Sequence, residues 1–571
     1  MRHQALISAL GLGVALWVGT FSAVTAQREP TAERFQQMLR RFPDADLNKD
    51  GKLTLEEYRE YRRKIQSSAA AAIAPPKAAP VTTNLSESSP VEIQITSDQP
   101  VPVNPRIYGT WCEEMFTKDL VDEPEYVAAL VDLKFKTFLY PGGSISYYHH
   151  PRGTGGFNIR PEEVRKSKHG DESRFMKEGS GPDHFEQYLR LLKASDAGAL
   201  FVVNILNGTA GELDEFLTRL KAEHVPIVAT ILGVEMHLGQ PATLGLDGYV
   251  ERIKPYLAML KTKYPEVPIV VHSTPVGRAG ARTPDSFHEW NQQLARLSGI
   301  GGFSQYGWTE FGGQARLQTL GTGLKADSSD KVWQQYDAFV RTFPQQQIPA
   351  YEKDWGPDKK MYITQWGTHS DRNTAVQGLH VANFYFFMAQ YNAVHDNYFA
   401  AATGALNLAA TVGMGMGRGG GLVYKEKVLL LAAYVYSKPF RHLFSGDKKL
   451  LTASVKGEKG DGQRQAVKAL AAAGSDGRKY LYLLNSGSAV ALGRVNSNGA
   501  TLSEGLSVQI ESAFGDPASA PAGATTRRAN SAPAKTFTGE KALRGLVLEP
   551  SSLTLLILPS RESAKLEQSS H

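Results

Sequence analysis

The sequence predicts an α/β protein built around a closed (β/α)8 barrel. The main observation is that short apolar, β-branched runs alternate with amphipathic helical patterns between residues 91 and 445. Such alternation is typical of parallel strands joined by right-handed helical crossovers, and about eight repeats are enough to close a barrel. Two further observations extend the prediction. A short helical unit with an acidic loop precedes the barrel, and strand-like alternation follows it between residues 446 and 560.

Composition and charge narrow the class of protein. The chain has 571 residues, 42% of them hydrophobic, and a net charge of +6, which is ordinary for a globular protein of several domains. Its Lys and Arg residues are scattered without a long basic run, so no nucleic acid partner is expected. The single cysteine, Cys112, excludes an internal disulfide.

Residues 1–26 predict a secretory signal peptide. Arg2 precedes an apolar core over residues 5–21, and Val24-Thr25-Ala26 offers small residues before a cleavage point at Gln27. A membrane anchor is the alternative, because this core is near the lower length limit for a span. No later segment has the length and apolarity for a stable membrane span. The mature protein is therefore expected to be secreted, in a periplasmic or extracellular location.

Residues 27–65 match a calcium-binding EF-hand. The twelve residues that begin at Asp46 place oxygen-bearing side chains at positions one, three, five, nine and twelve, with Gly51 at the turn. Calcium takes about six to eight oxygen ligands, and a glutamate at position twelve supplies two of them. An acidic surface turn is the alternative interpretation. The expected ligands of one Ca2+ ion are the side chains of Asp46, Asn48, Asp50, Thr54 and Glu57 and the carbonyl of Lys52.

Residues 66–90 are rich in Ala, Ser and Pro and predict a flexible linker, and the barrel follows over residues 91–445. A doubly wound open sheet is the alternative fold, but no G-x-G-x-x-G motif follows the first strand, which disfavours a dinucleotide site. Two amphipathic helices are expected at 126–134 and 212–223. The expected strands are 106–111, 137–140, 200–206, 225–232, 268–272, 302–306 and 361–364.

The C-terminal ends of these strands carry most of the chemistry-bearing side chains, and barrel enzymes place catalytic groups at that end. Aromatic rings mixed with Asn, His and acidic groups suit a sugar, whose C–H faces stack on rings while its hydroxyls need paired donors and acceptors. The alternative for each ring taken singly is a place in the core. The expected sugar contacts are Trp111, Tyr140, Asn204, His237, His272, Tyr306, Trp308 and Trp366.

Several of these segments resemble a known family. Tyr140-Pro-Gly-Gly-Ser-Ile-Ser, the segment from Asn204 to Glu235 and Met361-Tyr-Ile-Thr-Gln-Trp are similar to retaining glycoside hydrolases with a (β/α)8 barrel, namely α-L-arabinofuranosidases and the related β-glucuronidase/heparanase and β-xylosidase groups. The resemblance covers about residues 91–559. It implies that residues 446–560 form a C-terminal β-sandwich, with 561–571 as a polar tail. The implied partner is an oligo- or polysaccharide.

The resemblance also implies a catalytic pair. Glu235 occupies the acid/base position at the end of the fourth strand, and Gln365 occupies the nucleophile position at the end of the seventh. This chain departs from the family at two points. Val234 stands where the family has Asn, and Gln365 stands where it has Glu. A carboxamide is neutral and a poor nucleophile, and it cannot stabilise an oxocarbenium-like transition state by charge.

Three interpretations remain open at this point. The protein is a catalytically silent relative that binds a polysaccharide, or an active hydrolase that uses another carboxylate, such as Glu310 or Asp354, or an inverting water. The third is a structural or calcium-dependent adhesion module without sugar affinity. The third belongs to a different class of protein, and its marker would be a cleft that binds no sugar.

Overall fold

The computed structural model divides the chain into two compact units, residues 1–84 and residues 85–571, which are described separately. Within them, the structure describes residues 47–52, 54, 57, 90–117, 120–150, 159–160, 162–163, 184–238, 241–277, 282–308, 329–367, 375–404, 406, 408–412, 427–456, 466–515 and 534–560.

Several sequence predictions lie outside the described residues. These are the signal peptide (1–26), most of the EF-hand (27–65) including Asp46, nearly all of the linker (66–90), Glu310 and the tail (561–571). No helix within the described ranges is long and apolar enough to cross a bilayer.

The predicted barrel is confirmed. Among the described residues, eight strands close into a ring in chain order, and each one runs parallel to its neighbours. The seven expected strands are all present, and the eighth is an alanine-rich segment that the sequence analysis did not identify. The strands are β2 (Gly109–Trp111), β3 (Thr137–Tyr140), β4 (Gly198–Val202), β5 (Ile227–Leu232), β6 (Ile269–His272), β7 (Gly302–Trp308), β8 (Lys360–Gly367) and β9 (Phe399–Gly404).

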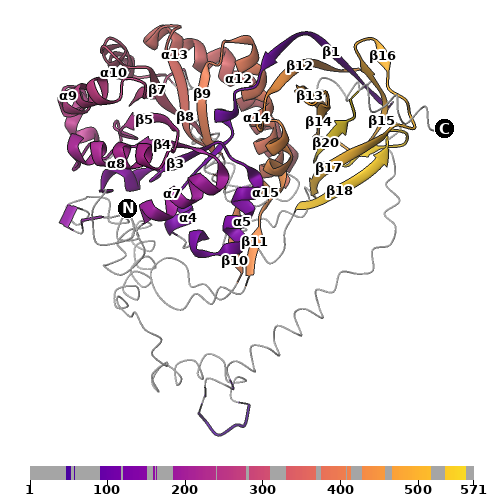
Figure 1. Cartoon of the computed structure of the whole chain (residues 1–571), viewed down its shortest axis with the longest axis horizontal. Helices are drawn as coiled ribbons and strands as arrows, with labels where there is room; N and C mark the ends of the chain where they lie inside the picture. Colours follow the sequence, from indigo (N-terminus) through magenta and orange to yellow (C-terminus); the bar gives the residue numbers. More distant parts are fainter. Residues whose placement is uncertain are drawn as a thin grey trace, which may run out of the picture. The chain divides into compact units, whose positions relative to one another are not determined.

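Helices surround the barrel (Figure 1). Both predicted helices form, within two residues of the expected limits. The second begins with a capping box, in which Thr209 and Glu212 bond each other's backbone N–H. The described helices are α4 (Glu113–Thr117), α5 (Pro124–Leu133), α7 (His184–Ser195), α8 (Ala210–Ala222), α9 (Gly245–Lys263), α10 (Asp285–Ala295), α12 (Ser329–Thr342), α13 (Ile348–Trp355), α14 (Ala375–Val394) and α15 (Ala432–Ser437). A hairpin of β10 (Ala409–Val412) and β11 (Lys427–Leu430) follows the last barrel strand.

A second layer is formed by a sheet that contains ten strands within the described residues. Its strands follow one another in the order β16-β15-β1-β12-β13-β14-β20-β17-β18, with β19 paired to β15. The strands are β1 (Val91–Pro102), β12 (Lys448–Lys456), β13 (Val467–Gly474), β14 (Lys479–Asn485), β15 (Val490–Ser497), β16 (Ala500–Thr501), β17 (Ser507–Gly515), β18 (Ala534–Ala542), β19 (Val547–Leu548) and β20 (Ser552–Leu558).

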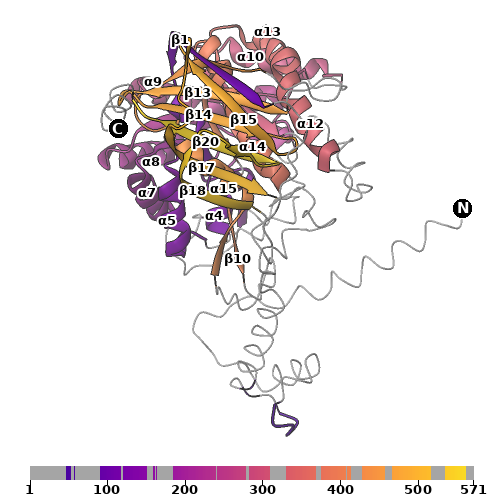
Figure 2. The ribbon, with the colours of Figure 1, turned by 90° about the vertical axis from the view of Figure 1, so that its right-hand side faces the viewer.

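Both faces of this sheet are buried, and β14 shows how. Tyr480, Tyr482 and Leu484 belong to the large core shared with the barrel and its helices, whereas Leu481 and Leu483 belong to a second core within the sheet domain. The alternation follows from the two-residue period of a strand. Helix α14 contacts the sheet strands β12, β14 and β20 and the barrel strand β8, so it is apolar around most of its circumference, while α15 contacts α14 and the sheet strands β17 and β18. Figure 2 shows the sheet face-on with α14 behind it.

The first strand corrects the expected start of the barrel. Residues 91–102 pair antiparallel with β12 and parallel with β15, so β1 belongs to the C-terminal sheet although it precedes the barrel in sequence. Its alternating Val91, Ile93 and Ile95 are fully buried in the core of that sheet. The chain therefore contributes a strand to the C-terminal sheet before it forms the barrel.

Candidate functional site

The C-terminal mouth of the barrel is organised around the turn that follows β3. A Cβ atom on Gly143 would lie 2.9 Å from Nε2 of Gln365, 3.1 Å from Oε2 of Glu113 and 3.2 Å from Cζ3 of Trp111. Only glycine leaves room for these three groups to converge on the turn. The three groups come from the ends of the first and seventh barrel strands, so they meet at the C-terminal end of the barrel.

Glu113 helps to hold this turn. Its Oε2 accepts a hydrogen bond of 2.8 Å from the N–H of Gly143, and its side chain is buried. Gly142, with φ of +144°, packs directly on the glutamate, since a Cβ there would lie 2.4 Å from Cβ of Glu113. Oε2 of Glu113 and Nε2 of Gln365 lie 3.1 and 2.9 Å from the same point, the Cβ position of residue 143. They are therefore at most about 6 Å apart.

Successive side chains of β8 point to opposite sides of the barrel wall. Gln365 is buried at the mouth, and its backbone is paired with Tyr306 of β7. The next residue, Trp366, is fully buried on the outer side, where its ring packs against Phe384 and Tyr385 of α14. The expectation that Trp366 stacks on a sugar is therefore wrong. The strand period places it in the helix layer whenever Gln365 faces inward.

Glu235 lies at the end of β5 on a strained turn. It has a positive φ of 48° and follows Gly233, whose φ is +86°. A left-handed conformation is rare for a glutamate and costs roughly 1–3 kcal/mol, and such strain is concentrated at functional sites. Its neighbours Val234 and Met236 are buried, while Glu235 is partly exposed. The geometry therefore presents the carboxylate of Glu235 on a turn that the fold holds rigidly.

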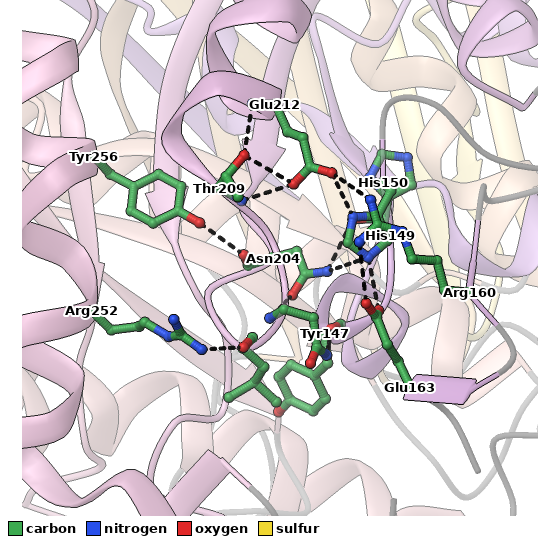
Figure 3. Close-up of polar contacts among 12 residues, drawn as sticks. Tyr147, His149, His150, Arg160, Glu163, Asn204, Thr209, Glu212, Arg252 and Tyr256 are labelled. Atoms are coloured by element: carbon green, nitrogen blue, oxygen red, sulfur yellow. Dashed lines mark hydrogen bonds and ion pairs between the residues drawn. The ribbon is translucent and has the colours of Figure 1, made fainter. Parts of the chain in front are cut away.

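A polar network fastens the loop after β3 to the ends of β4 and β5, and Figure 3 shows its part around Asn204 and His150. The Tyr147 hydroxyl donates to the carbonyl of Val234 at 2.9 Å, next to Glu235. The Asn207 amide donates to the carbonyl of Tyr147 at 2.9 Å, and the Asn204 amide donates to the carbonyl of His149 at 3.1 Å. These bonds place the loop that carries Gly143 and the turn that carries Glu235 in one connected frame.

The centre of the same network is a buried histidine with two carboxylate partners. The two ring nitrogens of His150 lie 2.9 Å from Glu212 and 2.8 Å from Glu163, and the ring is inaccessible to solvent. Each ring nitrogen therefore faces a carboxylate oxygen. Arg160 also reaches Glu212, at 3.0 Å, so the cluster contains one guanidinium, one imidazole and two carboxylates (Figure 3). It joins the β3 loop to the first turn of α8.

Burial corrects two more of the expected sugar contacts. Tyr140 is fully buried, stacks on Tyr188 and bonds His149 through its hydroxyl. The Asn204 side chain is also buried, and its oxygen accepts from the N–H of Asn207 while its nitrogen donates as described above. Tyr140 ends β3 and Asn204 follows β4, both at the mouth, but their polar atoms hold loops in place by hydrogen bonds.

His237 and His272 contact each other. Nδ1 of His237 lies 3.0 Å from Nε2 of His272, and the rings are parallel with centroids 5.2 Å apart. Burial, and to a lesser degree the neighbouring His237, lowers the pKa of His272 well below its ordinary value, so this ring is neutral at neutral pH. His272 is buried at the end of β6, whereas His237 is partly exposed two residues after Glu235.

The remaining expected contacts and alternatives divide as follows. Trp111 is partly exposed at the mouth. Tyr306 and Trp308 lie on β7, but their side chains, like Glu310, are outside the described residues. Asp354 lies on α13, where it accepts hydrogen bonds from Asn291 and Gln292 and contacts His288. It is used outside the barrel and is not a substitute nucleophile.

Glu113 is the residue at this site to which the sequence analysis gave no role. It directly follows the first barrel strand in Trp-Cys-Glu-Glu, the same placement that singled out Glu235. That signal was present, but two adjacent glutamates left open which one faces the mouth. The contact between Glu113 and Gly143 identifies it.

In the N-terminal unit, the described part of the acidic loop has the turns of a cation-binding loop. Gly51 has φ of +75°, and the side chains of Asn48 and Asp50 accept from the N–H groups of Asp50 and Lys52, at 2.9 and 2.8 Å. Glu57 turns back so that Oε2 accepts from Thr54 at 2.7 Å, which lowers the pKa of Glu57. Within the part of the chain that the structure describes, no group of three or more His, Cys, Asp or Glu residues is arranged to hold a metal ion.

Comparison with known proteins identifies the fold. No family model and no curated protein sequence matches the chain. Among solved structures, a GH51 arabinofuranosidase from Xanthomonas axonopodis pv. citri is 15% identical with a TM-score of 0.57, over 82% of this chain and 99% of that one. A family 51 α-L-arabinofuranosidase from Bifidobacterium longum is 12% identical with a TM-score of 0.55, over 83% and 100%. The chain thus has the barrel and β-sheet domain of these glycoside hydrolase structures.

Proposed function

We propose that the barrel mouth binds and hydrolyses an oligo- or polysaccharide, and α-L-arabinofuranosides are the first substrate class to test. The observation that carries the proposal is the convergence of Trp111, Glu113 and Gln365 on Gly143, in a mouth whose fourth strand presents Glu235. A ring beside carboxylate and amide groups offers a stacking surface together with hydrogen-bond partners for hydroxyls. The fold shared with arabinofuranosidases supports the choice of substrate.

Within this proposal, Glu235 is the general acid that protonates the leaving oxygen. Gln365 stands at the position of the family's nucleophile but lacks its charge. Val234 cannot replace the family's Asn, because its side chain is buried and only its carbonyl meets the network, through Tyr147. The site is therefore proposed to bind its sugar with fewer direct hydrogen bonds than the family pattern implies.

The test is binding of the full chain to a glycan array and to arabinofuranosyl oligosaccharides by calorimetry. Trp111→Ala is expected to weaken binding about fivefold, since a stacked ring contributes on the order of 1 kcal/mol. Trp355→Phe is the control, because Trp355 packs on Phe303 of β7 outside the barrel and should leave affinity unchanged. Absence of any glycan ligand would overturn the proposal and favour an adhesion or structural protein.

We also propose that the N-terminal unit binds one Ca2+ ion. The donor set fits a hard cation, since it consists of carboxylate, amide, hydroxyl and carbonyl oxygens, and the described loop already has a left-handed Gly51 and an inward-turned Glu57. The ligands would be Asp46, Asn48, Asp50, Thr54, Glu57 and the Lys52 carbonyl. The ion would neutralise carboxylates that otherwise repel one another.

Calorimetric titration of the full chain with CaCl2 tests this second proposal. One binding event is expected, and Glu57→Gln should abolish it because a bidentate carboxylate is lost. Glu223→Gln, on the barrel surface, is the control. Binding that persists in the Glu57→Gln variant would place the ion elsewhere. Export is proposed with it, and the mature N-terminus is expected at Gln27, which N-terminal sequencing of secreted protein would verify.

A further inference from the structure

The structure assigns to Glu113 the role of the catalytic base, in a hydrolysis that inverts configuration at the anomeric carbon. This inference rests on the proposed function and adds the residue that compensates for Gln365. At the mouth, the nucleophile position is occupied by Gln365, which carries no charge. The alternative carboxylate, Asp354, lies outside the barrel and accepts hydrogen bonds from Asn291 and Gln292. A second carboxylate within the mouth is what the chemistry requires.

Glu113 has the position for this role. Oε2 of Glu113 and Nε2 of Gln365 both lie beside the Gly143 turn, at most about 6 Å apart. The amide comes from the strand-seven end and the carboxylate from the strand-one end. Inverting enzymes use one carboxylate to activate a water, whereas retaining enzymes use it to attack the anomeric carbon. Because Gln365 cannot make that attack, a water beside Glu113 is the nucleophile that this inference requires.

Glu113 is also held firmly enough to act. The N–H of Gly143 donates to it at 2.8 Å, and the glycine pair allows the backbone to approach the side chain closely. That bond fixes one carboxylate oxygen and orients the group in a site largely closed to solvent. Pre-organised groups in such sites need little rearrangement during the reaction.

The step balances without any further reactant. A water oxygen forms a bond to the anomeric carbon from the face opposite the leaving group, and one of its protons passes to Glu113. The bond from the anomeric carbon to the glycosidic oxygen breaks, and that oxygen keeps the electron pair and takes the proton of Glu235. Gln365 positions the water by hydrogen bonding. Exchange with solvent then returns Glu113 to its ionised form and Glu235 to its protonated form.

The experiment is proton NMR of the first-formed sugar, with 4-nitrophenyl α-L-arabinofuranoside or any glycoside that the binding panel identifies. The wild type is expected to give the inverted anomer. Glu113→Gln keeps an acceptor for Gly143 and should fold, but its kcat should fall at least a hundredfold with KM changed little. Formate added to Glu113→Ala should restore part of kcat, because a small carboxylate can replace the base. Asp354→Asn is the control for a buried carboxylate outside the mouth.

Each outcome of these measurements either supports or overturns the role of Glu113. Retained configuration, an unchanged kcat in Glu113→Gln, or no rescue of a folded Glu113→Ala variant by formate would overturn the role of Glu113. Glycan binding without any hydrolysis by the wild type would also overturn it, while leaving sugar recognition intact. A chain that binds no glycan refutes the proposed function itself, and this inference falls with it.

Discussion

Replacement of Gln365 by glutamate is the sharpest test of how the barrel mouth works. The change adds one negative charge with almost no change in volume, at a side chain that is only 4% exposed. A carboxylate about 3.5 Å from an oxocarbenium-like carbon, at an effective dielectric constant of about 20, contributes roughly 5 kcal/mol. If that interaction is made only in the transition state, it corresponds to a rate gain of roughly 3,000- to 5,000-fold.

The same charge has a cost that can be measured separately. It would lie no more than about 6 Å from Glu113, which is itself buried, and repulsion at that distance amounts to roughly 3 kcal/mol at the same dielectric constant. Gln365→Glu should therefore be faster but less stable than the wild type at neutral pH. The stability difference should shrink below about pH 4, where carboxylates become protonated.

The assay combines thermal melting with NMR analysis of the product. Gln365→Glu should release the retained anomer, and Glu235→Gln added to it should abolish the gain because the leaving group loses its proton donor. Gln347→Glu, at a buried glutamine on the turn between α12 and α13, is the matched control and should lose stability without gaining activity. An unchanged rate and melting temperature in Gln365→Glu would refute its placement at the anomeric carbon.

Two further predictions concern stability. Burial lowers the pKa of His380 to about 3, so below pH about 6.5 the unfolded chain binds a proton that the folded chain does not. The free energy of unfolding therefore falls by roughly 1.4 kcal/mol per pH unit as the pH drops. Urea unfolding at pH 7 and pH 5 should show a smaller loss in His380→Phe than in the wild type. Glu212→Gln removes a carboxylate partner from the buried His150 and should lower the free energy of unfolding by about 2–3 kcal/mol in the same assay, whereas Glu266→Gln at an exposed ion pair should leave it nearly unchanged.

Strand prediction worked where hydrophobicity and β-branching coincide. Residues 225–232 form a strand because an apolar, β-branched run suits burial on both faces. The eighth barrel strand, Phe399–Gly404, was not predicted because half of its residues are alanine and none is a β-branched aliphatic, so the signal is weak. The alternation of Val91, Ile93 and Ile95 correctly indicates a strand with a buried face. It cannot indicate the partner, which lies on β12 more than 300 residues away.

The site was predictable only in part, because a sequence shows which residues end a strand but not how their side chains are used. Trp366 and Gln365 are adjacent, and the period of two allows only one of them to face the mouth. Asn204 has the right position and chemistry for a sugar contact, but its amide is used by the backbone of the β3 loop. Such use depends on loops whose conformation is set by distant contacts, such as that between His150 and Glu212.

The pairing of Glu113 with Gln365 explains why a neutral side chain suits the nucleophile position in this chain. Two carboxylates within about 6 Å in a nearly closed mouth would repel each other, and one of them would tend to hold a proton. An amide of the same shape removes that repulsion, which suits a base at Glu113. It also leaves a hydrogen-bonding group to orient water. The change from Glu to Gln at this position therefore removes one mechanism of glycoside hydrolysis and, with Glu113 behind it, is compatible with another.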